Sequence, residues 1–71
     1  GEISQKLIEE IGVDTYRNWF SKLTAEVDEV AKTIELKAPS EFVKDWITSY
    51  YQGIIERIIK ASGFELTNLE C

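Results

Sequence analysis

The side chains that could perform acid–base chemistry in this chain are its carboxylates, which occur as adjacent pairs such as Glu9/Glu10 and Asp28/Glu29. A hydrolase can use two carboxylates, but it needs a pocket that tunes their pKa values apart. A chain of 71 residues leaves little volume for such a pocket beside its own core. We therefore interpret these acids as solvated surface groups and expect no catalytic residue.

The other chemistry-bearing residue types are sparse. Histidine is absent and Cys71 is the single cysteine, so zinc sites of the usual ligand types and Ser-His or Cys-His nucleophiles are excluded. The glycines are scattered and form no phosphate-binding loop; they are Gly1, Gly12, Gly53 and Gly63. We expect no metal, no cofactor and no enzymatic activity.

Charge and hydropathy restrict the partners. The formal net charge is -5, from 13 acidic and 8 basic residues, and such a chain repels phosphate backbones at long range. No apolar run approaches the ~20 residues that a membrane-spanning helix needs, so we expect no membrane partner.

One thiol cannot form an internal disulfide, which fits a reducing compartment. The chain starts at Gly1 and not at Met, so we expect Gly1 to be left from expression, and Cys71 at the very end suggests a segment of a longer protein.

The elements that must position any site begin with one long amphipathic helix. Its apolar residues recur at helical spacing and form one broad stripe about five turns long; they are Phe42, Val43, Trp46, Ile47, Tyr50, Tyr51, Ile54, Ile55, Ile58 and Ile59. Ser40 is a suitable N-cap, and Gly63 a suitable left-handed stop.

Two shorter helices are predicted before it. Gly12 ends the first and Asp14 caps the second. Their apolar residues are Ile3, Leu7, Ile8 and Ile11 for the first, and Tyr16, Trp19, Phe20 and Leu23 for the second. Helices this short melt in isolation, so they must pack on something larger.

The spacing changes to a period of two in three further segments, which predicts half-buried strands. Asp28 to Lys32 would connect the first two strands as a hairpin. The alternating residues are Ala25 and Val27, then Ile34, Leu36 and Ala38, then Phe64 and Leu66. The order α-α-β-β-α-β predicts one α+β domain over residues 1–71, with helices packed on one face of a three-stranded sheet.

Two segments carry distinctive motifs. In APSEFVKDWITSYY, residues 38–51, a predicted strand end in Ala-Pro is followed by an aromatic, then Asp-Trp, then Tyr. TYRNWFSKL, residues 15–23, places an aromatic-x-x-Trp-aromatic segment on the second predicted helix. Both segments resemble motifs of the DnaA N-terminal domain family of bacterial replication initiators. Ile3 stands where the family often carries Trp, and Ser40 replaces its usual Asn.

The resemblance implies a KH-like fold without ATPase or origin-binding activity. It implies a cytoplasmic docking hub, nucleoid-associated through the full-length protein, that binds the replicative helicase and initiation regulators and associates weakly with itself. Carried over, self-association falls on Ile3 and Leu7. Helicase and regulator contact falls on Phe42, Thr15, Asn18 and Asp45.

Alternatives remain at this stage. Phe42 either packs in the core or is an exposed anchor for a partner, whereas Trp19 and Trp46 are expected in the core. A KH-like module that binds single-stranded nucleic acid weakly is a second hypothesis, although no GXXG loop is present. A stand-alone adaptor that carries this domain is a third.

Overall fold

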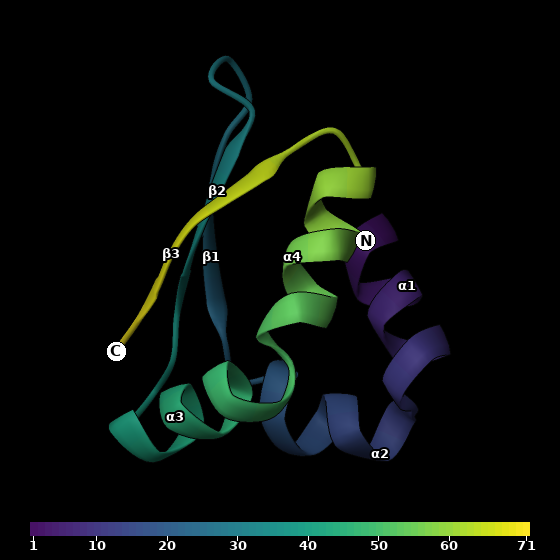
Figure 1. The fold of residues 1–71 in the computed structure, drawn as a ribbon, viewed down its shortest axis with the longest axis vertical. Coiled ribbons are helices and arrows are strands. Elements are labelled where there is room, and N and C mark those ends of the chain that lie inside the picture. Colours follow the sequence, from purple (N-terminus) through teal and green to yellow (C-terminus); the bar gives the residue numbers. More distant parts are fainter.

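The chain forms a mixed α+β structure, which confirms the predicted fold class. The computed structural model describes residues 1–71. Its elements are α1 (Glu2–Ile11), α2 (Val13–Thr15), the π-helical segment η1 (Tyr16–Phe20), β1 (Thr24–Asp28), β2 (Thr33–Lys37), α3 (Glu41–Tyr50), α4 (Gln52–Ala61) and β3 (Glu65–Glu70). The helices gather to one side of the sheet and beneath it (Figure 1).

The sheet has the order β1-β2-β3, with β1 antiparallel and β3 parallel to the central strand β2. The hairpin between β1 and β2 lacks an Asn-Gly turn and is closed by a side chain instead. The Asp28 carboxylate accepts hydrogen bonds from the backbone N–H groups of Val30 and Ala31 at 3.0 and 2.9 Å. An Asp in this role mimics a backbone turn.

Both predicted boundary residues of the long apolar stripe are confirmed. Ser40 Oγ accepts a hydrogen bond from the Val43 N–H at 3.3 Å. Gly63 has φ 89°, a conformation that side-chain-bearing residues rarely adopt. The N–H groups of Gly63 and Phe64 bond to the Lys60 and Ile59 carbonyls, which is the Schellman pattern of helix termination.

The prediction of one continuous helix between those boundaries is wrong, because the helix breaks at Tyr51. This residue has φ -131° and ψ 0°, so α3 and α4 are separate helices and the observed order is α-α-β-β-α-α-β. The Tyr51 ring packs edge-on against Phe20, with centroids 5.5 Å apart. The break lets each helix turn its own apolar face to the core.

The expected cap at the second helix is also wrong. That helix begins at Val13 after Gly12, without a side-chain cap. Asp14 is exposed and pairs with Arg17, with 3.7 Å between their charged atoms.

Ten apolar side chains form the core, and no polar side chain is buried with them. They are Leu7, Phe20, Ile34, Leu36, Ala38, Val43, Ile47, Ile55, Ile58 and Ile59. The alternation predicted for β2 is confirmed, because Ile34 and Leu36 are buried. The half-buried face expected for β1 is wrong, because all five of its residues are exposed.

Removing the Ser40 hydroxyl tests the cap. Ser40→Ala should lower the free energy of unfolding by about 0.5–2 kcal/mol, because the Val43 N–H loses its acceptor. Urea denaturation followed by circular dichroism measures the change. Ser49→Ala, on the exposed side of the same helix, is the matched control and should change stability little; equal losses in the two variants would contradict the role of the cap.

Candidate protein-interaction surface

Four aromatic rings from η1 and α3 pack against one another in succession. Trp19 lies between Phe42 and Trp46, with ring centroids 5.7 and 4.8 Å away, and the Trp46 ring is 4.6 Å from Tyr50. Phe42, Trp46 and Tyr50 are spaced by four residues along α3, so they share one stripe of that helix. We call these four residues the aromatic row.

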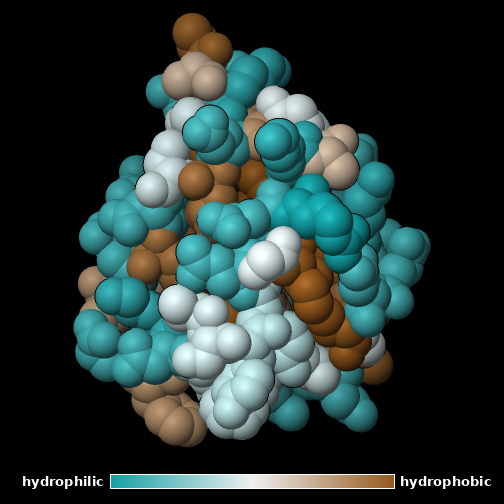
Figure 2. All heavy atoms as spheres, in the orientation of Figure 1, coloured by the Kyte–Doolittle hydropathy of each residue, from teal (hydrophilic) through white to brown (hydrophobic).

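The aromatic row is largely a surface feature. Phe42 is 68% exposed and Tyr50 64% exposed. Trp19 is half-buried and packs against the core, as expected. Trp46 is half-buried but is absent from the core and from the residues packed on it, so its placement in the core was wrong. Near-neutral residues, drawn white to pale, gather on the surface near the junction of α3 and α4 (Figure 2).

The register of α3 explains why these rings are outside. Val43 and Ile47 form the neighbouring stripe and are the buried residues of this helix. Since a helix presents only one face to the core, the stripe that begins at Phe42 lies beside that face. The spacing of Phe42, Trp46 and Tyr50 was visible in the sequence. Because the predicted apolar stripe was broad, however, the sequence did not show which half of that stripe faces the core.

One polar group in the aromatic row has no partner. The indole Nε1 of Trp46 is covered by its neighbours and donates no hydrogen bond. A buried donor without an acceptor costs about 1–3 kcal/mol, and such groups are rare in folded proteins. The Trp46 indole N–H is therefore a donor that no other group of the chain pairs.

The other residues predicted for helicase and regulator contact lie near the row. Asn18 precedes Trp19 in η1 and is exposed, and Asp45 precedes Trp46 in α3 and is exposed. Thr15 ends α2 and is half-buried. The π-helical hydrogen bond from the Ser21 N–H to the Tyr16 carbonyl, 2.8 Å, lies in the same segment, and such turns often accompany functional sites.

The two residues predicted for self-association differ in position. Ile3 is half-buried on the first turns of α1, so part of its side chain faces solvent. Leu7 is only 4% exposed and belongs to the core. An interface on α1 would therefore have to use Ile3 and the exposed neighbours of Leu7.

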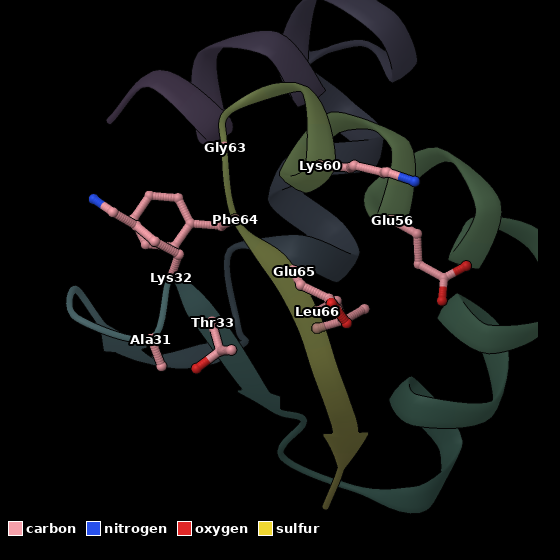
Figure 3. Close-up of a pocket in the computed structure, with 9 residues that line it drawn as sticks. All are labelled: Ala31, Lys32, Thr33, Glu56, Lys60, Gly63, Phe64, Glu65 and Leu66. Carbon is pink, nitrogen blue, oxygen red and sulfur yellow. The ribbon is translucent and has the colours of Figure 1, made fainter.

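The largest hollow on the surface, about 750 Å³, lies between the hairpin, the end of α4 and the start of β3 (Figure 3). Lys32 covers the Phe64 ring, with its nitrogen 5.2 Å from the ring centroid. The amino groups of Lys32 and Lys60 extend to opposite sides of the view, so the two cations do not converge on one anion (Figure 3).

Groups that could carry chemistry do not converge either. No cluster of three or more His, Cys, Asp or Glu residues is placed to hold a metal ion. Glu41 accepts a hydrogen bond from the Cys71 thiol at 3.0 Å, and this bond raises the pKa of Cys71. A raised pKa reduces the fraction of reactive thiolate at neutral pH. None of the helices has the length and apolar character to cross a lipid bilayer.

Fold and surface together define a small α+β domain with a row of aromatic rings at its surface, of which Phe42 and Tyr50 are exposed. Residues 1–61 match the family model of the DnaA N-terminal domain. The chromosomal replication initiator protein DnaA of Rickettsia massiliae (strain Mtu5) is 31% identical over 68 residues, and that of Rickettsia canadensis (strain McKiel) 34% identical over 68 residues. Each alignment covers 96% of this chain and 14% of the relative. The chain belongs to the DnaA N-terminal domain family.

Truncating two phenylalanines tests which aromatic residues hold the fold. Phe42→Ala should lower the free energy of unfolding by about 1 kcal/mol, because this substitution removes mainly the ring contact with Trp19. Phe20→Ala should lower it by about 3–5 kcal/mol, because Phe20 is buried. Thermal and urea unfolding measure both, and a larger loss for Phe42→Ala would refute the surface position of its ring.

Proposed function

We propose that this chain is a non-catalytic protein-interaction domain of a chromosomal replication initiator, acting in the cytoplasm at the origin. Its family supports a domain of a replication initiator. The observation that carries the docking role is the exposure of Phe42 at the head of the aromatic row. The chain spans 14% of the length of the matched relatives. Any other activity of the initiator would belong to the part of the protein outside this domain.

The aromatic row has the composition of an interface hot spot. Trp and Tyr dominate the binding energy of protein interfaces, and they do so where rings are already held in place. Trp19 and Trp46 brace each other in a stacked pair with planes 12° apart. Phe42 and Tyr50 extend this pair at both ends, so a partner would meet a preorganised apolar strip.

The partners proposed for this surface are the replicative helicase and regulators of initiation. This assignment rests on the family's use of the aromatic at the start of its third helix, which is Phe42 here. Asn18 and Asp45 supply exposed polar groups beside the row, and Thr15 lies one helical turn before Trp19. An apolar centre with a polar rim is the usual anatomy of such interfaces.

Self-association is proposed for α1, centred on Ile3. Leu7 packs in the core and would support this helix from beneath. Weak pairing suffices, because several initiators bound at one origin raise the effective concentration of their terminal domains. Binding of nucleic acid is expected to be weak at most, since the net charge is -5.

The proposed helicase contact is tested with Phe42→Ala. The affinity for the replicative helicase of the organism that encodes this chain should fall about 30-fold, the effect of losing one hot-spot side chain. Isothermal titration calorimetry measures it. Val30→Ala is the matched control, because Val30 is 95% exposed on the hairpin and lies outside the aromatic row. Unchanged affinity in Phe42→Ala would remove the basis of this proposal.

Self-association is tested by sedimentation over a concentration series. The unmodified chain should show a rising average mass, and Ile3→Ser should shift this rise to higher concentration. Val13→Ser is the control, because Val13 is 50% exposed but outside α1. A strictly monomeric chain at millimolar concentration would count against this part of the proposal.

A further inference from the structure

The strand β1 is an open edge of the sheet. It pairs with β2 on one side only, through the register from Thr24↔Lys37 to Asp28↔Thr33. All five residues are exposed, and no turn, loop or cap hydrogen bond involves their backbone. An uncovered edge presents unpaired N–H and C=O groups that can accept a further strand.

An apolar groove lies under this edge, because the helices leave the inner face of β1 uncovered. Val27 is 50% exposed there. The groove has a volume of about 200 Å³ and eleven of its twelve lining residues are hydrophobic, including Ile3, Tyr16, Phe20 and Ala25. It exceeds the ~150 Å³ apolar cavity that holds benzene in an engineered protein. It can therefore take apolar side chains from an added strand.

The outer face of the same edge is acidic. Glu26 of β1 lies directly opposite Glu35 of β2. Like charges in this position destabilise a sheet, and neither carboxylate has a cationic partner within ion-pair distance. Asp28 follows on the same face of β1, and Glu29 comes next in the hairpin. Lys or Arg side chains on an added strand would meet these carboxylates.

We propose that β1 accepts an extended segment of a partner protein in which apolar residues alternate with Lys or Arg. The apolar residues enter the groove, the basic residues face Glu26 and Asp28, and the backbones pair as strands. A second copy of this chain fits poorly, because antiparallel pairing of two β1 strands about their centre would oppose Glu26 to Glu26. This inference goes beyond the proposed function. The groove shares no residue with the aromatic row, whereas Ile3 and Leu7, named for self-association, are among its lining residues.

Fluorescence anisotropy with a labelled peptide of alternating Val and Lys tests the proposal on the 71-residue chain. The alternating peptide should bind, and a peptide of the same composition with Val and Lys in separate blocks should bind at least tenfold more weakly. N-methylation of the peptide backbone at every second residue, on the side facing β1, should abolish binding because it removes the strand hydrogen bonds. Equal binding of the methylated peptide, or no binding of the alternating one, overturns the proposal.

Glu26→Lys should weaken binding of the alternating peptide roughly three- to tenfold, since a favourable cross-strand pair becomes a repulsive one. Glu56→Lys, on the exposed surface of α4 and outside the groove, makes the same change in net charge and should weaken it less than twofold. Equal losses would mean unspecific attraction and would overturn the proposal. Glu26→Lys relieves its contact with Glu35, so the variant should remain folded; circular dichroism checks this.

Two further measurements separate this inference from the proposed function. Phe42→Ala should bind the alternating peptide as the unmodified chain does. Glu26→Lys should leave helicase affinity unchanged, so the strand-addition proposal and the helicase proposal fail independently. If sedimentation showed a dimer that Glu26→Lys disrupts, the occupant of the edge would be a second copy and the proposal would be wrong.

Discussion

The structure depends on a small apolar core in which the isoleucines of α4 meet the central strand. Ile55, Ile58 and Ile59 of α4 and Ile34 and Leu36 of β2 are all buried in one cluster. Only ten of the 71 residues are buried, because a chain this short has too much surface for its volume. α1 and η1 each add one buried side chain to this cluster, Leu7 and Phe20, and α3 adds Val43 and Ile47. The apolar residues left over necessarily form surface. The aromatic row is built from such residues, and the groove lies where core side chains meet the exposed Ala25 and Val27 of β1.

The break at Tyr51 decides how the leftover residues are distributed. Tyr51 turns to Phe20 and joins the packing around the core, whereas Tyr50, one residue earlier, packs on Trp46 at the surface. A continuous helix would have kept one stripe from Phe42 to Ile59 facing a single direction. The break instead separates a helix that holds the core, α4, from a helix that also supports an exposed strip, α3.

Local signals in the sequence predicted local structure well. Ser40 and Gly63 act as expected because capping depends on a hydroxyl acceptor and a positive φ at single residues. The alternation of Ile34 and Leu36 was sufficient to place β2, since both point to one covered face. The sequence did not decide whether the Phe42 side chain is buried or exposed, because helical spacing does not show which edge of a broad apolar stripe the core covers.

The features that the sequence did not predict depend on how much of the sheet the helices cover and on which side chains occupy the buried positions. β1 has the same alternation as β2, but no helix extends over its inner face, and Val27 stays exposed. Trp46 was expected inside because large rings usually are, yet the buried positions on α3 are taken by Val43 and Ile47. Leu7 differs from the sequence-based expectation in the other direction. It was expected at a self-association surface because its helix is terminal, but its side chain is buried in the core.

The segment η1 connects the two exposed surfaces. Trp19 belongs to the aromatic row, and the next residue, Phe20, lines the groove under β1 and packs on Tyr51. The surfaces therefore share a short stretch of backbone but no side chain. Substitutions at Phe42 or Glu26 can change one surface alone, whereas any change in the course of η1 would move Trp19 and Phe20 together.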